Sequence, residues 1–245
     1  MKNILIVGAT SAIAGSCARL WAAEGATFFL VGRDEVKLQQ TADDLASRGS
    51  RVHTHILDVN RFDAHAPMLD ACVAALGKID ISLIAHGTLP DQAACESDSR
   101  LAVEEFTTNG LSVIALLTDL ANRIEDQRHG SIAVISSVAG DRGRASNYLY
   151  GAAKSAVSEF CSGLQGRLLK CGVNLLVVKP GFVDTPMTQG LQLPGLLLAT
   201  PEKVAKDIVN AIDKNKGVLY TPWFWRPVMF AIVHIPHVVF KRLNL

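Results

Sequence analysis

The sequence predicts an α/β domain with a doubly wound, parallel seven-stranded sheet and helices on both faces. Short apolar runs alternate with longer helical patterns from one end of the chain to the other, which is typical of this class. No linker, repeat or shift in composition divides the 245 residues, and such folds commonly reach this length as one domain. Hydrophobic residues make up 49% of the chain, which is enough apolar material for a large core.

The positions of these runs give the expected elements. We expect strands at Asn3–Val7, Thr27–Val31, Arg51–Leu57, Ile79–Ala85, Ser131–Ser136, Val173–Lys179 and Gly217–Tyr220. Helices are expected to begin near Ser11, Asp34, Arg61, Ser99, Ser146 and Pro201. We therefore assign residues 1–220 to a single domain and residues 221–245 to an apolar C-terminal tail.

Charge and cysteine usage limit the classes of partner. The chain has 24 basic and 23 acidic residues, a net charge of +1, which gives no electrostatic reason to expect nucleic acid. Five cysteines, an odd number without Cys-x-x-Cys spacing, indicate reduced thiols of a cytoplasmic protein. His53 and His55 alternate along a strand and no Cys/His/carboxylate spacing suggests ligands, so we expect no metal.

The amino terminus, Met1–Val7, combines a basic residue with a short apolar run. It has no cleavage site and enters a glycine turn at once, so we interpret it as a strand rather than a signal peptide. No stretch offers the ~20 uninterrupted apolar residues of a membrane-spanning helix.

A tyrosine and a lysine four positions apart, Tyr150 and Lys154, form the candidate catalytic centre. They lie in an Ala-rich run that favours a helix from about Ser146, and positions four apart project from the same helix face. A lysine cation beside a phenol favours the phenolate, so we expect Lys154 to lower the pKa of Tyr150 from its ordinary value of about 10. Tyr148, six residues from Lys154, points to a different face.

Ser137 ends the apolar run that precedes this helix, where open α/β sheets place their ligands. A hydroxyl at this position could hold a substrate carbonyl or alcohol against Tyr150. The alternative is a chance Tyr-x-x-x-Lys pair on an ordinary helix, so the rest of the chain decides between the two.

The first strand is followed directly by a segment placed where dinucleotide-binding folds approach a pyrophosphate. Gly8 supplies the tight turn. The loop continues with Ala9, Thr10, Ser11, Ala12, Ile13 and Ala14. Hydroxyls and a helix cap are present, but alanines stand where a Gly-x-x-x-Gly-x-Gly loop has its later glycines. The segment predicts a Rossmann-type nucleotide site, with a plain strand-to-helix turn as the alternative.

Arg33 and Asp34 follow the second strand. A carboxylate about 20 residues after the glycines prefers an unphosphorylated ribose, whereas an arginine there accommodates a 2′-phosphate. Arg33 lies at that distance and favours NADP(H) over NAD(H), unless it is a solvated surface residue. Asp34 counts against this choice unless it caps the next helix.

Two further strand ends complete the expected cofactor site. Asp58 and Val59 close the third strand, where a carboxylate and an amide could bind the adenine end. Ala85, His86 and Gly87 close the fourth, where a glycine lets the backbone lie against the nicotinamide.

Together these pieces resemble the short-chain dehydrogenase/reductase family over essentially the whole chain. The residues that carry the resemblance are Gly8 to Ala14, Asp58, Gly87, Asn109, Ser136, Ser137, Tyr150, Lys154, Pro180 and Gly181. The resemblance implies that Tyr150 transfers a proton, that Lys154 also holds the nicotinamide ribose and that Ser137 binds the substrate oxygen. It further implies that Asn109 positions a water between Lys154 and solvent; without it, Asn109 is an ordinary buried asparagine.

The segment Lys179–Thr185 matches the family's loop that contacts the nicotinamide carboxamide. The resemblance thus adds Pro180, Gly181, Val183 and Thr185 to the cofactor site. The family's Asn-Asn-Ala-Gly tetrapeptide is Ile84–Gly87 here, which puts its sheet-stabilising asparagine contact in doubt.

Two hypotheses follow for the activity. The first is an NADP(H)-dependent carbonyl reductase or alcohol dehydrogenase, a homodimer or homotetramer. The second, prompted by the departures in the glycine loop and the tetrapeptide, is a nucleotide-binding regulatory or scaffold protein without turnover. The intact set of Ser137, Tyr150, Lys154 and Asn109 favours the enzyme.

Two apolar segments bear on the substrate. Residues 186–200 follow the cofactor loop, and we expect them either to close over an apolar substrate or to pack in the core. The tail 221–245 is interrupted by prolines and ends in a basic pair, which suits either the plane of a membrane surface or an oligomer interface. The tail and the glycine loop resemble a subgroup that reduces a 2-keto pentose on a polyprenyl phosphate carrier.

Overall fold

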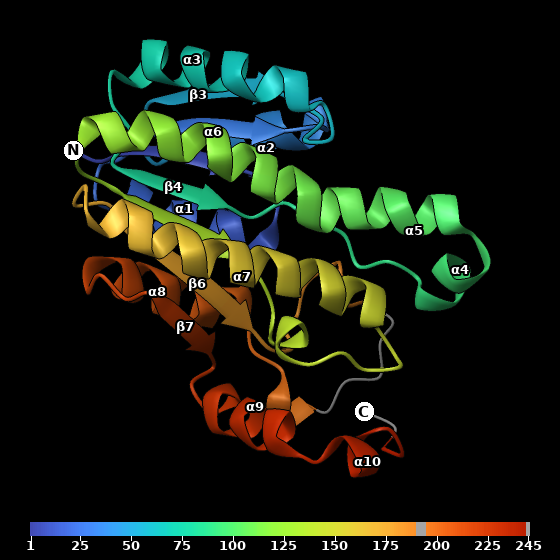
Figure 1. The fold of residues 1–245 in the computed structure, drawn as a ribbon. Helices are drawn as coiled ribbons and strands as arrows, with labels where there is room; N and C mark the ends of the chain where they lie inside the picture. The colour runs from blue at the N-terminus through green and yellow to red at the C-terminus, as the bar shows by residue number, and fades with distance from the viewer. Residues whose placement is uncertain (190–194, 244–245) are drawn as a thin grey trace.

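The computed structural model describes residues 1–189 and 195–243, and it has the doubly wound α/β architecture that the sequence predicts. Seven parallel strands form one sheet in the order β3-β2-β1-β4-β5-β6-β7. Figure 1 shows helices stacked on both sides of this sheet. The strand order reverses between β1 and β4, and the carboxyl ends of strands at such a reversal are where these folds bind ligands.

The strands lie where the apolar runs predict them. Their bounds are β1 (Asn3–Val7), β2 (Thr27–Gly32), β3 (Val52–Ile56), β4 (Ile81–Ile84), β5 (Ser131–Ile135), β6 (Asn174–Pro180) and β7 (Val218–Thr221). The largest difference from the expected bounds is at β4, which begins at Ile81 rather than Ile79. The Ile79 amide instead donates to the side chain of Gln127, at 2.8 Å.

The helices form two layers, each packed on one face of the sheet. One layer holds α1 (Ala12–Ala22), α2 (Glu35–Ser47) and α8 (Pro201–Asp213), and the other holds α3 (His65–Leu76), α6 (Ser112–Gln127) and α7 (Tyr148–Leu169). Trp21 of α1 and Met68 of α3 are fully buried, one in the core of each face. The helix expected near Arg61 starts with a short 3-10 turn, Phe62–Ala64, before α3.

Several helices are not predicted by the apolar pattern. They are α4 (Gln92–Ser97), α9 (Trp225–His234) and α10 (His237–Phe240). The helical run expected from Ser99 consists of α5 (Ser99–Phe106), a π-helical turn at Thr107–Leu111 and α6, which follow one another as a single long rod in Figure 1. Asn109 lies within the π turn, and such turns are frequent at functional sites.

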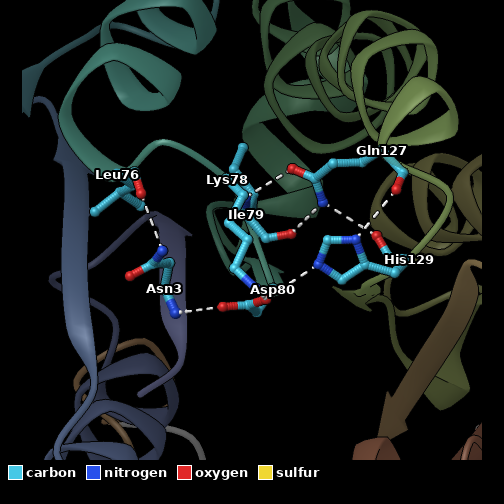
Figure 2. A network of polar contacts seen from close by, with 7 residues as sticks. All are labelled: Asn3, Leu76, Lys78, Ile79, Asp80, Gln127 and His129. Carbon is cyan, nitrogen blue, oxygen red and sulfur yellow. Dashed lines mark hydrogen bonds and ion pairs between the residues drawn. The ribbon is translucent and has the colours of Figure 1, made fainter.

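A polar network joins the amino ends of the central strands, at the edge of the sheet opposite the ligand-binding edge (Figure 2). Asp80 accepts a hydrogen bond from the Asn3 amide at 2.8 Å and lies 3.2 Å from Nε2 of His129. The Gln127 side chain accepts from the Ile79 amide and donates to the Ile79 carbonyl, both at 2.8 Å. These contacts fasten the starts of β1 and β4 to the end of α6.

The C-terminal tail packs on the domain through one of its sides. Trp225 and Met229 of α9 are buried against Val138. Arg142 donates to three carbonyl oxygens at the end of α9, and its guanidinium lies 3.7 Å from the centroid of the Phe240 ring. The other side of the tail faces solvent. In the described part of the chain, no helix has the length and apolarity needed to cross a membrane.

Candidate active site

The carboxyl ends of the central strands border one cavity of about 850 Å³, a size typical of small-molecule and cofactor sites. All residues that the sequence assigns to catalysis or cofactor binding line it: Gly8, Thr10, Ser11, Ala12, Ile13, Arg33, Asp58, Val59, Ala85, His86, Gly87, Asn109, Ser137, Tyr150, Lys154, Pro180, Gly181, Val183 and Thr185. The fold therefore brings together segments that lie far apart in the sequence.

The loop after β1 fits a pyrophosphate. Gly8 has a φ of +82°, and a Cβ at this position would stand 2.5 Å from the backbone nitrogen of His86. Ser11 is the N-cap of α1 but makes no capping bond with its side chain, so its hydroxyl and the first amides of the helix remain for an anion. Ala12 and Ala14 lie within α1 and have no positive φ, so alanine there carries no backbone strain.

The loop after β2 presents two cations to the cavity, Arg33 and Lys37. Arg33 is exposed and forms no hydrogen bond or ion pair within residues 1–189 and 195–243. Asp34 caps α2 by accepting a hydrogen bond from the Lys37 amide at 3.0 Å, so the capping interpretation of this residue is confirmed.

His86 lies in the segment Ile84–Gly87, which replaces the family's Asn-Asn-Ala-Gly tetrapeptide, and joins the end of β4 to α6. Its Nε2 lies 3.0 Å from the Ser112 hydroxyl, which itself donates to the Thr108 carbonyl at 2.7 Å. Because Ser112 has only one proton to donate, His86 is the donor to Ser112 and carries its proton on Nε2. Burial and the nearby charges of Lys154 and His65 lower the pKa of His86 to about 3, so the ring is neutral.

Gly87 allows Asn109 and Lys154 to approach each other. A Cβ on Gly87 would stand 2.9 Å from Oδ1 of Asn109 and 3.5 Å from Nζ of Lys154. The Asn109 amide accepts from the Thr88 amide at 2.9 Å and donates to the Thr88 hydroxyl at 2.8 Å and the Glu105 carbonyl at 3.0 Å. Asn109 is thus buried and fixed beside Lys154, and the water that it would hold stays a prediction.

Two glycines bring the turn after β5 onto α7. The turn is Val138–Asp141. A Cβ on Gly140 would stand 2.7 Å from the carbonyl carbon of Lys154, and a Cβ on Gly151 would stand 2.9 Å from the carbonyl oxygen of Ala139. Any larger residue at either position would push the turn away from the helix.

This close approach places three functional side chains together. The Ser137 hydroxyl accepts from the Ala139 amide at 3.1 Å and lies close enough to the Tyr150 phenol to lower its pKa. Lys154 is 3% exposed; its Nζ lies 5.6 Å from the centroid of the Tyr150 ring and donates to the Ile135 carbonyl at 3.1 Å. Tyr148, in contrast, is exposed on another face of α7.

The pKa of the phenol differs from the expectation. Burial raises the pKa of Tyr150 to about 12, although the nearby Ser137 hydroxyl acts to lower it. Burial also lowers the pKa of Lys154 to about 8. The expectation that Lys154 lowers the Tyr150 pKa is therefore wrong for this structure, because the ammonium is directed to the Ile135 carbonyl rather than to the phenol oxygen. Tyr150 is protonated throughout the neutral range.

A protonated phenol beside a hydroxyl can act on a carbonyl oxygen. Ser137 and Tyr150 can both donate to an oxygen held between them, and Tyr150 can pass it a proton as negative charge develops. A nicotinamide bound in the cavity would supply or accept the hydride. The roles of Lys154 and Asn109 at the nicotinamide stay predictions.

The segment after β6 forms the remaining wall. The Gly181 amide donates to the Thr221 carbonyl at 3.1 Å, and a side chain on Gly181 would overlap the Trp225 indole. Val183 is buried and pairs with Ala199. The tail helix α9 therefore packs directly against the loop that the family resemblance assigns to the nicotinamide.

Some residues of the cavity are missing from the predicted set. They include Lys37, Thr88, Glu105, Arg144, Asn147, Phe182 and Met187. They lie on loops or helix ends whose place at the cavity depends on tertiary packing, although Phe182 and Met187 belong to segments that the sequence already singles out. Of residues 186–200, expected to close over the substrate, positions 190–194 lie outside the described residues, and Pro186 and Met187 line the cavity.

Comparisons with known proteins agree with this geometry. The short chain dehydrogenase family matches residues 2–194. An uncharacterised oxidoreductase of Mycobacterium tuberculosis is 39% identical over 241 residues, which cover 98% of this chain and 96% of the relative. The ketoacyl reductase HetN of Nostoc is 30% identical over 224 residues, which cover 88% of this chain and 76% of the relative.

Two solved structures share the fold. A variant of actinorhodin polyketide ketoreductase with NADPH has a TM-score of 0.81 at 22% identity, covering 90% of this chain and 95% of that one. A short chain dehydrogenase of Mycobacterium paratuberculosis bound to NAD has a TM-score of 0.79 at 24% identity, covering 89% and 95%. With the family match over most of its length, the chain belongs to the short-chain dehydrogenase/reductase family and is an oxidoreductase acting on CH–OH and C=O groups.

Proposed function

We propose that the protein is an NADP(H)-dependent reductase that converts a ketone into a secondary alcohol. The observation that carries the proposal is the convergence of Ser137, Tyr150 and Lys154 in the cavity that also takes in the amino end of α1. In the reaction, hydride adds to the carbonyl carbon, Tyr150 protonates the oxygen and the nicotinamide is left oxidised.

The protonation of Tyr150 supports reduction as the working direction. A phenol with a pKa of about 12 is a proton donor at neutral pH and a weak candidate for a base. An alkoxide formed between Ser137 and Tyr150 would take that proton readily.

The preference for NADP(H) is supported by charge. Arg33 and Lys37 line the cavity after β2, and Asp34 is occupied in capping α2. The 2′-phosphate would thus meet the guanidinium of Arg33, which is unpaired within the described residues, and the ammonium of Lys37, which lies 3.7 Å from the Asp34 carboxylate. NADPH and NAD are each bound by one of the two structures compared above, so those proteins do not decide the choice.

An apolar substrate is supported by the wall beside the catalytic residues. Phe182 and Val138 line the cavity and belong to the cluster that buries Trp225 and Met229. Together with the resemblance of the tail and glycine loop, this wall favours a ketone that carries an apolar portion, such as a polyprenyl-phosphate-linked keto sugar. The test of the whole proposal combines a titration of NADPH and NADH with NADPH consumption over a panel of ketones. Nucleotide binding without consumption of any ketone would favour a regulatory protein, and binding of neither nucleotide would contradict both readings.

We further propose that the exposed side of the tail lies on an anionic membrane surface. Trp223 and Phe230 are 76% and 67% exposed, and residues 221–245 contain three basic residues and no acidic one. Exposed aromatic side chains with flanking positive charge suit the interface of an anionic bilayer. Such a position would bring the cavity close to a lipid-linked substrate.

A further inference from the structure

The positively charged side chain of Arg144 lies on the cavity wall without a contact from the described residues that would stabilise it there. It lies between the turn that follows Ser137 and the start of α7, and it borders the same cavity as Tyr150. Its Nε and Nη2 are buried, and neither has a hydrogen-bond partner in the described parts of the chain. A buried guanidinium without a partner is costly, because it loses water and gains nothing in return.

No acidic side chain forms an ion pair with Arg144 among the described residues. The acid that acts on it electrostatically is Asp141, which already accepts from Lys179 at 2.5 Å and from Tyr220 at 2.9 Å. Glu105, an acid on the cavity wall, accepts from the Thr88 hydroxyl and lies 3.4 Å from the Asn109 amide. Burial lowers the pKa of Arg144, but a guanidinium stays protonated in proteins.

Arg142, two residues before Arg144, has a structural role and provides the comparison. Arg142 donates to three carbonyl oxygens of the tail and lies over the ring of Phe240. Arg144, two residues later, has none of these partners and is directed to the cavity instead.

Asn147 adds a second polar group to the same wall. Its backbone amide donates to the Arg144 carbonyl at 3.2 Å, so the two residues belong to one turn. Its side-chain Oδ1 is buried and has no hydrogen-bond partner in the described parts of the chain. It stands immediately before α7, three residues from Tyr150. The wall beside the catalytic phenol thus offers a guanidinium fork, which is the donor chemistry of a carboxylate or phosphate site. The Asn147 oxygen next to it is an acceptor and can take a hydrogen bond from a substrate hydroxyl.

We infer that Arg144 binds an acidic group of the substrate, a carboxylate or a phosphate, while Ser137 and Tyr150 hold its ketone oxygen. The inference rests on the proposed reductase activity for the identity of the reacting group. The substrate class is therefore a keto acid or a keto phosphate, with the acidic group on the Arg144 side of the carbonyl.

The test compares ketones that differ only in charge. Levulinate is paired with its methyl ester, and dihydroxyacetone phosphate is paired with dihydroxyacetone. kcat/KM is measured for the wild type, R144Q, R144K and R51Q, since Arg51 is an exposed arginine before β3 at the opposite edge of the sheet. We expect R144Q to lose about 10- to 100-fold more kcat/KM on the acid than on its neutral partner. R144K keeps the charge but not the guanidinium fork, so its selective loss of kcat/KM should lie between those of the wild type and R144Q. R51Q should match the wild type.

The larger selective loss, on levulinate or on dihydroxyacetone phosphate, identifies a carboxylate or a phosphate as the group bound. Thermal unfolding of R144Q supplies a second measurement, with a Tm equal to or above that of the wild type expected, because an unpaired buried charge is removed. Equal losses on acidic and neutral ketones, or a lowered Tm with no change in selectivity, would overturn the inference.

If the wild type reduces none of the four ketones, the proposed reductase activity fails on these substrates, and equilibrium binding decides the anion site separately. Levulinate and dihydroxyacetone phosphate are then titrated calorimetrically into the protein, alone and with NADP⁺. Binding that weakens at least about tenfold in R144Q supports the site. Binding that is absent in the wild type, or unchanged in R144Q, contradicts it.

Discussion

Gly151 of α7 lies against the carbonyl oxygen of Ala139, so closely that a Cβ on the glycine would stand 2.9 Å from that oxygen. Gly151 directly follows Tyr150, and Ala139 lies two residues after Ser137. The distance between the phenol and the serine hydroxyl therefore depends on a backbone contact that only glycine permits.

This contact gives a first prediction. Gly151→Ala should lower kcat by about tenfold or more, because a shift of the turn by less than 1 Å misplaces Ser137 relative to Tyr150. Gly163→Ala is the matched control, since Gly163 lies in the same helix with open space around it and alanine there should stabilise the helix by about 0.5–1 kcal/mol. Steady-state kinetics and thermal unfolding of both variants check this. Full activity in the Gly151 variant would show that the contact between Gly151 and Ala139 does not fix the position of Ser137 relative to Tyr150.

The choice of cofactor gives a second prediction. Arg33→Ala should raise the Kd of NADPH about tenfold or more, because a charge-assisted bond to the 2′-phosphate is lost, and should change the Kd of NADH by less than about twofold. Fluorescence titration of both nucleotides measures this, with Arg51→Ala as the control for removal of an exposed arginine. Equal weakening for the two nucleotides would refute the assignment of Arg33.

The network at the amino edge of the sheet gives a prediction of pH dependence. Burial works against the charged form of Asp80, but hydrogen bonds from the Asn3 amide, Lys78 and His129 outweigh it and lower the pKa of this carboxyl. A group whose pKa is lower in the folded state contributes stability above its unfolded pKa of about 4, and this contribution is lost as the pH falls through the folded value. Asp80→Asn should therefore cost about 1–2 kcal/mol at pH 7 and progressively less below about pH 4.

Urea unfolding at several pH values measures the difference between the wild type and Asp80→Asn. Asp63→Asn is the control, because Asp63 pairs with Arg61 on the open surface and its removal should leave the midpoint unchanged. A difference that stays constant from neutral to acidic pH would mean that the charge of Asp80 is not what stabilises the fold.

The tail gives a fourth prediction. Replacing Trp223 and Phe230 together by serine should weaken sedimentation with phosphatidylglycerol vesicles about tenfold or more, whereas phosphatidylcholine vesicles bind weakly in both cases. Leu169→Ser, at the 77% exposed last residue of α7, is the control for loss of a surface apolar side chain. Absence of vesicle binding by the wild type, together with a smaller mass in solution for the double variant, would show that this face joins two copies of the chain instead.

Much of the fold follows from the sequence because its strands are continuous apolar runs bounded by turn residues. β1 matches its expected bounds, and most other strand ends differ by a single residue. The π turn that holds Asn109 could not be predicted, because a local i to i+5 bond leaves no trace in a 3.6-residue apolar period. α4 is also missed, since it is only six residues long and too short to show a helical apolar period.

The candidate site likewise has residues that the sequence predicts and properties that only the packed structure shows. Residues with a defined place in the strand-to-helix connections, such as Gly8 and Ser137, could be placed on the cavity from spacing alone. The pKa of Tyr150 could not, because the distance of four residues from Lys154 does not reveal where the ammonium is directed or how deeply the phenol is buried. Arg144 could not be predicted either, because the absence of a hydrogen-bond partner for its buried Nε and Nη2 depends on how the described chain packs.

The most direct test of proton transfer by Tyr150 is the rate of NADPH consumption by Tyr150→Phe on a ketone that the wild type reduces. The substitution keeps the ring and removes the proton donor, so kcat should fall by about 10²- to 10⁴-fold while the Kd of NADPH changes less than about fivefold. A kcat within tenfold of the wild-type value would contradict the account, because another group would then have to protonate the substrate oxygen.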